Sequence, residues 1–427
     1  MVGRNHAQAA AFRDVVISGL GFILPHADTP DDVWHHLGSG LSQLSQLPAT
    51  LRGQTGVHSA GRIHVFHHQR YVPGLPDGFA KRYSRDILIV LSAVRNAALD
   101  AGLDHITPDR TGVVASSARG PVEWWSQTAS GRTFNPDVPP ISVTQSIFAS
   151  LPGTPAALSA VQLGARGLVT TIANACVGGH QALGIAAHEL QESRADVMFV
   201  VGHELPLVPE LLQLYSSPGS SVLTRETEPQ RAIRPYDVHR DGFALGEGAV
   251  VMVLERAPHA LARGARPYAS LRAYHSINEA AHATRMDLSG RTSATMMNQA
   301  LDATGRAPHD LDYICGHGTA TRYNDVAESR ALSHLFGPRR STWAPLGSIK
   351  PIYGHLLGAA GLMNCAAIAL MLRHQCLAPT INCEIAEPEC DHDHVTEGPR
   401  PGKVQLALSL SFAIGSQSSA VVLEAAA

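Results

Sequence analysis

Cys176 is the side chain in this sequence that is best placed to act as a nucleophile. The residues before it, Gly167–Ala173, are apolar and partly β-branched, and from Gln181 the apolar residues recur at helical spacing, so we predict a strand, a turn and a helix. A thiol on that turn lies at the positive end of the helix dipole, which favours the thiolate. Gly178 and Gly179 would let the backbone approach closely and leave room for a substrate in front of the sulfur. The pattern also fits a buried cysteine that packs as a small apolar side chain.

Two histidines and a lysine are further candidates for chemistry. His317 follows a short apolar stretch and is bracketed by Gly316 and Gly318, which predicts an imidazole at a strand end with little steric cover. His355 lies at the start of a helical stretch so apolar that it must be buried. Either histidine also fits a structural residue whose ring is hydrogen-bonded in the core. Lys350 is one of only three lysines in the chain, and a lone lysine before a buried histidine is hard to explain as a solubilising charge.

The elements that would position these residues alternate between strand and helix patterns. The apolar stretch Val197–Gly202 predicts a buried parallel strand, which forms a strand–helix–strand unit with the Cys176 segment. The polar segment 256–267 separates two halves with a similar order of elements, so we place one domain at 13–258 and a second at 259–427. The other expected strands are Val15–Ser18, Thr111–Ser116, Ala249–Leu254, Leu271–Tyr274, Leu311–Gly316, Leu346–Ile349, Val404–Ser411 and Ser419–Leu423, and the expected helices include Arg85–Ala101, residues 141–163, Ser293–Ala303, Val326–Leu335 and Leu356–Leu372.

Two segments of the first half have a possible functional interpretation. Gly19-Leu20-Gly21 follows the first expected strand and predicts a turn. A single GxG, with no third glycine and no acidic residue at the right distance, is only weak support for a dinucleotide site, so we discount it. The segment Ser117–Pro140 contains glycine and proline and includes Trp124 and Trp125, so we expect a functional or interface loop.

The composition narrows the class of protein. With 427 residues, 44% of them hydrophobic and 16% charged, the chain can bury a large core and is too long for one simple domain. A net charge of −3 gives no bulk attraction for nucleic acid. The apolar runs are interrupted before membrane-spanning length, and the first residues lack the apolar core of a signal peptide, so we expect a soluble, cytoplasmic protein with no membrane partner. The six cysteines are too sparse for a disulfide scaffold and are expected to be free thiols.

Five short motifs follow one another along the chain: NACVGG (174–179), RPYDVHRDGFALGEG (234–248), CGHGTATRYNDVAES (315–329), SIKPIYGHLLGAAG (348–361) and SFAIGSQ (411–417). Their order and spacing resemble those of the β-ketoacyl-[acyl-carrier-protein] synthases, the elongating condensing enzymes of fatty-acid and type II polyketide synthesis. Each motif alone could arise by chance, but the resemblance extends from Val15 to Leu423.

The resemblance implies a thiolase-like α/β fold, in which two similar α/β halves form five layers, αβαβα, with the active site between them. It also implies an obligate dimer, either a homodimer or a heterodimer with a subunit like a chain-length factor. Acyl carrier protein is the implied partner, because it carries the substrates on its phosphopantetheine arm. The implied chemistry requires no metal and no redox cofactor.

The resemblance also assigns roles to residues that match its motifs. Cys176 corresponds to the nucleophile that accepts the acyl chain, and His317 and His355 correspond to the histidines that promote decarboxylation of malonyl and stabilise the enolate. Lys350 and Glu328 correspond to charged residues that order the site. The other implied site residues are Thr319 and Thr321 at the pantetheine arm, Ala413 and Gly415 at the substrate, and the backbone N–H groups of Cys176 and Ile414 as the oxyanion hole.

The implied reaction suits these residue types. Thioester exchange needs a thiolate, which a neighbouring imidazole favours. Loss of CO2 from malonyl then supplies a carbanion equivalent without a strong base, and two imidazoles that donate hydrogen bonds to the thioester oxygen would stabilise the enolate. Glu328 has a second interpretation, because Asp325 and Glu328 have the spacing of a helix cap and its N3 residue.

Several residues depart from the family pattern. The C-terminal gate, commonly GFGG, is AIGS at 413–416, so Ile414 replaces a bulky aromatic residue. Trp124 and Trp125 would narrow the acyl pocket or lie at the dimer interface. These changes favour specialised polyketide or polyene synthesis over housekeeping fatty-acid elongation, since gate size affects specificity and not reaction class. The other departures are Leu410 for a usual Asn, Pro351 for a frequent Ser and Gly178 for a common Ser.

Two other interpretations stay open. A non-catalytic subunit like a chain-length factor would usually lack the nucleophile, whereas Cys176 is present. A zinc site is the second, because one acid-rich loop holds four closely spaced side chains of the right type. His180, one helical turn beyond Cys176, is expected to line the pocket. The four potential zinc ligands are Cys383, Cys390, His392 and His394.

Overall fold

The computed structural model describes residues 10–80, 82–129, 143–217, 221–338 and 343–426. Strands and helices alternate along the chain, as the sequence predicts. Up to residue 256 the main elements are β1 (Ala10–Ala11), β2 (Val15–Ile23), α1 (Pro30–Gly38), α4 (Arg85–Asp100), β5 (Thr111–Ser116), α5 (Val122–Ala129), α6 (Val143–Ala149), α7 (Thr154–Leu163), β6 (Val169–Ile172), α8 (Gly178–Gln191), β7 (Val197–Glu204), α9 (Pro209–Tyr215) and β8 (Gly248–Arg256). After α10 (Ala257–Ala262) they are β9 (Ala269–Asn278), α11 (Arg291–Asp302), β10 (Tyr313–Cys315), α12 (Arg322–Phe336), β11 (Leu346–Gly347), α13 (Lys350–Tyr353), α14 (Ala360–His374), β14 (Leu406–Ala413) and β15 (Gln417–Ala425).

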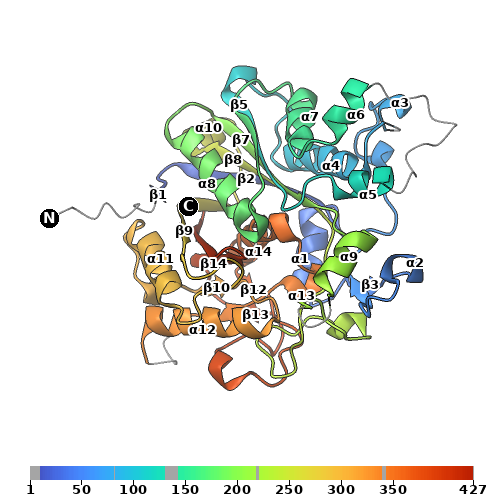
Figure 1. Ribbon diagram of the computed structural model, residues 1–427. Coiled ribbons are helices and arrows are strands. Elements are labelled where there is room, and N and C mark those ends of the chain that lie inside the picture. Colours follow the sequence, from blue (N-terminus) through green and yellow to red (C-terminus); the bar gives the residue numbers. More distant parts are fainter. Residues whose placement is uncertain (1–9, 81, 130–142, 218–220, 339–342, 427) are drawn as a thin grey trace.

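The strands form a mixed sheet of 11 strands in the order β11-β10-β14-β15-β9-β2-β8-β7-β5-β6, with β1 beside β9. Strands from the first part of the chain occupy one end of this order and strands from the second part the other (Figure 1). The two sets join where β2 pairs antiparallel with β9, through Val16 with Ser270 and Ile17 with Ala269. Strand β1 also pairs antiparallel with β9, so the two halves are continuous through β9. The proposed division at residues 258 and 259 stays a prediction.

Helices α8 and α14 form the middle of five layers. Helix α8 contacts β5 and β7 of the first set and β9 and β15 of the second, and α14 likewise packs against β8 on one side and β14 on the other. Helices α4 and α7 cover the outer face of the first set, and α11 and α12 cover that of the second. This arrangement confirms the predicted five-layered αβαβα fold.

Helix α14 owes its apolar composition to this central position. The stretch Leu357–His374 is long and apolar enough to cross a membrane by composition alone, and 89% of it is buried inside the protein. Both faces of the helix are covered by sheets, so few positions tolerate polar side chains. The composition is that of a core helix.

The glycines at the start of the chain have a role that the sequence did not predict. Strand β2 continues through Gly19 and Gly21 to Ile23, so the predicted turn is wrong. A Cβ at Gly21 would lie 2.2 Å from the carbonyl oxygen of Ala93, and one at Gly19 would lie 2.6 Å from the Cβ of Ala101. The two glycines let α4 approach the strand closely, which is why they occur inside it.

The other local predictions are correct for some elements and wrong for others. Strand β5 has the predicted bounds and α4 is one residue shorter than predicted. The segment Ser117–Pro140 is not wholly a loop, because residues 122–129 form α5, and residues 130–140 lie outside the described ranges. Trp124 and Trp125 are neighbours on α5 with their rings edge to face, 5.0 Å between centroids. The helix predicted over 141–163 is two helices, α6 and α7.

Candidate active site

Cys176 lies where the sequence placed it, on the turn between β6 and α8. The turn is a single 3-10 turn, Ala175–Val177, and α8 begins at Gly178. A Cβ at Gly178 would lie 2.5 Å from Ser116 Oγ, and one at Gly179 would lie 2.8 Å from the backbone nitrogen of Leu362. The two glycines therefore allow close packing of α8 on β5 and α14, which confirms the expected close approach of the backbone. The expectation that they also leave space for a substrate is wrong.

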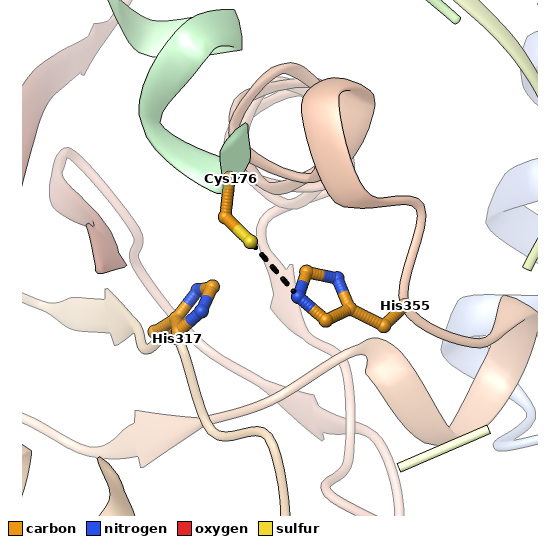
Figure 2. Close-up of side chains that lie close together, drawn as sticks. All are labelled: Cys176, His317 and His355. Carbon is orange, nitrogen blue, oxygen red and sulfur yellow. Dashed lines mark hydrogen bonds between the residues drawn. The ribbon is translucent and has the colours of Figure 1, made fainter. Parts of the chain in front are cut away.

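Three chemically active side chains from separate segments converge at this turn (Figure 2). Cys176 Sγ lies 3.2 Å from His355 Nε2, and the rings of His317 and His355 stand nearly perpendicular with 5.3 Å between their centroids. The sulfur and one nitrogen of each ring all lie within 4.8 Å of one another. The structure thus brings together the three residues that the sequence indicated.

The tautomer of His355 follows from its backbone contact. The N–H of Leu357 donates to His355 Nδ1 over 3.2 Å. Burial and the charge of Lys350 hold the pKa of His355 well below its usual value, so the ring is neutral. A neutral ring that accepts at Nδ1 carries its proton on Nε2. His355 therefore presents an N–H donor to the sulfur of Cys176.

His317 is held through its main chain. Its backbone N–H donates to Glu328 Oε1 over 2.6 Å, and Lys350 Nζ donates to its carbonyl oxygen. The N–H of Gly318 and the hydroxyl of Tyr236 donate to Glu328 Oε2, each over 3.0 Å. Lys350 and Glu328 thus belong to one network, as expected, and they meet at the backbone of His317.

The acidic residues of α12 do not cap that helix. The helix begins at Arg322 and its N-cap is Thr321, so Asp325 and Glu328 lie inside it. Asp325 instead accepts hydrogen bonds from the backbone N–H groups of Tyr236 (2.8 Å) and Thr319 (3.1 Å). The capping interpretation is wrong, because these buried carboxylates bind backbone N–H groups from other segments.

Burial controls the ionisation of the site. It raises the pKa of Cys176 to about 12, although the charge of Lys350 acts in the opposite direction. This is contrary to the thiolate expected at a helix N-terminus, because that expectation did not include the desolvation of a thiol that lies between the two halves. The side chain of Cys176 is nevertheless only partly buried, because it borders the cavity. Burial also raises the pKa of Glu328 to about 7 and lowers the pKa of Lys350.

A cavity of about 740 Å³ opens in front of the three residues. Thr319 and Thr321 lie on its wall with their hydroxyls 2.7 Å apart, and Ala413 and Ile414 line it as well. Gly415 lies in the β14–β15 turn, where its carbonyl accepts a hydrogen bond from Asn278. The lining residues are Ala118, Arg119, Ala175, Cys176, Leu214, Tyr215, Val222, Phe243, Thr284, Arg285, Met286, Leu288, His317, Thr319, Thr321, Tyr323, Asn324, His355, Leu357, Phe412, Ala413 and Ile414.

Trp124 and Trp125 are not among the residues that form this wall within the described ranges. Trp125 is instead about half exposed on α5. In the single chain, the predicted narrowing of the acyl pocket by these rings is therefore unsupported.

Glu204 is a site residue that sequence reasoning missed. This buried carboxylate, at the end of β7, accepts hydrogen bonds from the backbone N–H groups of Ala118 (2.7 Å), Arg119 (3.2 Å) and Gly358 (3.1 Å). It ties the segment after β5 to the segment before α14, and both segments line the cavity. The signal was a charged residue two positions after the apolar stretch Val197–Gly202.

The expectation that His180 lines the pocket is wrong, and the alternative zinc interpretation is not supported at His394. His180 does not line the cavity; its ring is buried between Ser419 Oγ (3.0 Å) and Ser409 Oγ (2.9 Å). His394 is one of the potential zinc ligands. Its two ring nitrogens lie within hydrogen-bond distance of the backbone carbonyls of Leu346 (3.0 Å) and Cys390 (2.7 Å). Within the described ranges, one group of three His, Cys, Asp or Glu side chains lies close enough together to share a metal ion. It consists of Cys176, His317 and His355.

Comparison with known proteins identifies the family. A family model described as the β-ketoacyl synthase N-terminal domain matches residues 12–260, and the model of the C-terminal domain matches residues 268–384. The chain belongs to the β-ketoacyl synthase family. Its motifs, its layers and the convergence of Cys176, His317 and His355 agree with that membership.

Relatives come from two pathways. The chain is 32% identical to the ketoacyl synthase alpha subunit of the tetracenomycin polyketide synthase of Streptomyces glaucescens, over 97% of both chains. It is 30% identical to 3-oxoacyl-[acyl-carrier-protein] synthase 2 of Coxiella burnetii, over 96% of this chain and 98% of the other. A type II polyketide ketosynthase, solved with its acyl carrier protein and bound to a hexaketide, superposes with a TM-score of 0.85 at 28% identity over 97% of this chain and 100% of that one.

Proposed function

We propose that this chain catalyses a decarboxylative Claisen condensation between an acyl chain on Cys176 and malonyl-acyl-carrier-protein, in type II polyketide or polyene synthesis in the cytoplasm. The observation that supports it most is the contact of Cys176 Sγ with the Nε2–H of His355, beside His317 in one cavity. The product is a β-ketoacyl chain on the carrier protein. Family membership supports the reaction class.

The first step is thioester exchange. The sulfur of Cys176 attacks the carbonyl carbon of the acyl thioester, the bond from that carbon to the carrier's sulfur breaks, and the thiol proton of Cys176 ends on the departing pantetheine sulfur. Because burial raises the pKa of Cys176 to about 12, deprotonation accompanies the attack instead of preceding it. The backbone N–H groups of Cys176 and Ile414 would stabilise the oxyanion.

The second step forms the carbon–carbon bond. The malonyl carboxylate leaves as CO2, and its bonding electrons form an enolate whose oxygen accepts hydrogen bonds from His317 and the Nε2–H of His355. The enolate carbon attacks the Cys176 thioester, the carbon–sulfur bond breaks, and the sulfur takes up one proton from solvent. Burial keeps the pKa of both histidines well below its usual value, so both rings act as neutral donors.

Other groups position these reactants. Lys350 and Glu328 fix the main chain of His317. Thr319 and Thr321 line the cavity, where their hydroxyls would bind the pantetheine arm. No metal enters this scheme: His355 Nδ1 accepts the N–H of Leu357, so its Nε2 carries a proton where a metal ion would need a lone pair.

The proposed dimer uses the edge of β6 that no strand of the described residues pairs with. This strand ends the sheet order, and two apolar residues there, Leu168 and Val169, are each 38% exposed. Val161, on the neighbouring α7, is 76% exposed. Apolar side chains on an unpaired edge strand are normally covered by a partner. A second copy fits this edge, and so does a subunit like a chain-length factor, since a solved ketosynthase/chain length factor resembles this chain with a TM-score of 0.85 at 25% identity.

Acyl carrier protein would dock at the mouth of the cavity. Arg285 and Tyr323 line the cavity, and both are exposed, as is the adjacent Arg322. Two arginines beside an exposed aromatic ring complement an acidic partner.

Charge reversal at both arginines should weaken binding of the carrier protein and leave acylation by a small pantetheine thioester unchanged.

Intact-protein mass spectrometry tests the nucleophile. The protein is incubated with an acyl-carrier-protein thioester, and we expect one acyl adduct on the wild type and none on Cys176→Ala. Cys376→Ala is the matched control, since Cys376 is a free, half-buried thiol outside the cavity. An adduct on Cys176→Ala, or none on the wild type with any chain length, would contradict the proposal and favour a non-catalytic subunit.

A further inference from the structure

Arg119 is a charged residue in a cavity whose walls are largely apolar. It lies three residues after the end of β5, and its backbone N–H donates to Glu204. Its guanidinium donates to the hydroxyl of Tyr215 over 2.8 Å and lies over that ring, with 5.4 Å from Cζ to the ring centroid. Both side chains line the same cavity as Cys176.

Ring contacts connect this pair to the catalytic residues. The ring of Tyr215 meets Phe243 edge to face, with 6.4 Å between centroids, and Phe243 meets His355 in the same way at 4.9 Å. The positive charge of Arg119 is also close enough to lower the pKa of the Cys176 thiol, against the larger effect of burial. An acyl chain on Cys176 that follows this wall therefore meets Arg119.

Arg119 has hydrogen-bonding capacity that the described residues leave unused. A guanidinium has five N–H donors, and within the described ranges its side chain donates to Tyr215, with no carboxylate within ion-pair distance. A chain of methylene groups lying over it would displace water without replacing the lost hydrogen bonds, which costs free energy. An oxygen on the chain would accept from the free N–H groups instead.

We propose that Arg119 and Tyr215 form a subsite that selects acyl chains carrying an acceptor oxygen beyond the thioester, as a ketone or a carboxylate, over chains of methylene groups alone. The subsite rests on the proposed function, because the chain it selects is the one attached to Cys176. Arg119 donates to the oxygen, and Tyr215 holds the plane of the guanidinium. This subsite makes the chain a poor synthase for saturated chains.

Competition between matched thioesters tests the subsite. Pantetheine thioesters of octanoate, of an oxo-octanoate and of octanedioate are compared by the rate of Cys176 acylation, followed by mass spectrometry. We expect an oxygenated chain to react about tenfold faster than octanoyl. Arg119 is exposed, so water competes for its N–H groups and keeps the expected preference at this modest value. Arg119→Leu should abolish or invert that preference, and Tyr215→Phe should reduce it about threefold. The faster of the two oxygenated thioesters shows whether the subsite prefers a ketone or a carboxylate.

Two further measurements separate this proposal from the proposed function. Arg95→Leu, at an exposed arginine that lines a different cavity, should keep the wild-type preference. In the Cys176→Ala background, calorimetry of the same three thioesters measures selection without any reaction. Tighter binding of an oxygenated thioester that is lost in Arg119→Leu supports the subsite even if no thioester acylates the wild type. Equal selectivity with Arg119 and with Leu at this position, in both measurements, would overturn it.

Discussion

Cys176 is subject to two opposing effects at the scale of single residues. Burial raises the pKa of the thiol to about 12, and the charge of Lys350 lowers it. The Nε2–H of His355 also stabilises negative charge on the sulfur. The reactivity of the Cys176 thiol therefore depends on the charge of Lys350. The ammonium group of Lys350 donates to the carbonyl oxygen of His317 and not to the sulfur.

Replacement of Lys350 by Met should make Cys176 less reactive. Removing the cation raises the thiol pKa further, so we expect alkylation by iodoacetamide near neutral pH to slow about tenfold, which corresponds to about one pKa unit. Lys350→Arg, which keeps the charge, should retain more of the rate. An unchanged alkylation rate in Lys350→Met would show that this charge does not act on the sulfur.

Replacement of Glu328 by Gln should separate the two steps of the reaction. The amide keeps one acceptor oxygen but sets an N–H against the N–H of His317 or Gly318, so His317 loses its position. We expect condensation to slow at least about tenfold and acylation of Cys176 to stay near the wild-type rate. Equal losses in both steps would contradict a role through His317.

The same variant has a pH-dependent effect on stability. Burial raises the pKa of Glu328 from 4.5 to about 7, so between these values the folded protein binds a proton that the unfolded chain releases. The wild type should therefore gain free energy of unfolding relative to Glu328→Gln as the pH falls from about 8 to about 6. Urea unfolding at both pH values measures this difference, and a difference that is constant with pH would contradict the raised pKa.

The sequence located Cys176, both histidines, Lys350 and Glu328 through their motifs, but not their ionisation. The pKa of Cys176 is raised because segments that are far apart in the chain bury the thiol. The local pattern of strand, turn and helix around Cys176 carries no information about those segments. Glu204 was missed for a related reason, because its partners are backbone N–H groups and leave no trace in residue types.

At the scale of elements, glycine placement determines how closely helices and strands approach. The Cβ positions of Gly19 and Gly21 are occupied by α4, and that of Gly179 by α14. In sequence these glycines are indistinguishable from turn glycines, so the first strand was predicted to end too early. The periodic helices and the continuous apolar strands, such as α4 and β5, were predicted well because their signal is local.

Gly179→Ala should destabilise the protein. The new methyl group would lie 2.8 Å from the backbone nitrogen of Leu362, so α8 and α14 must separate, at a cost of roughly 1–3 kcal/mol in the free energy of unfolding. Gly402→Ala is the matched control, since a Cβ there has no neighbour within 4 Å. Equal stability of the two variants in urea would show that the contact between α8 and α14 adjusts freely.

At the scale of the whole molecule, the site exists only because the two ends of one continuous sheet enclose a shared middle layer of helices. Cys176 lies on the turn before one middle helix, α8, and His355 precedes the other, α14. The motif order and the resemblance predicted this arrangement, whereas the continuous pairing of β2 with β9 was not predicted, since no residue pattern marks a strand pair between distant segments.

The free edge of β6 should govern assembly. Val169→Lys introduces a charge at the unpaired strand, so we expect native mass spectrometry to shift from dimer to monomer. Leu261→Lys, at a 70% exposed position on α10, is the matched control and should leave the dimer intact. A dimer that persists in Val169→Lys would place the interface elsewhere, and a monomeric wild type would favour a heterodimer.

The most direct test of the central claim is the discharge of acylated Cys176 by malonyl-acyl-carrier-protein, followed by intact mass spectrometry in the wild type and in His317→Ala. We predict that the adduct on the wild type disappears and that the carrier protein gains the acyl chain extended by two carbons, whereas the adduct on His317→Ala persists. An adduct that survives on the wild type, or that is lost by hydrolysis without a β-ketoacyl product, would contradict the proposed condensation.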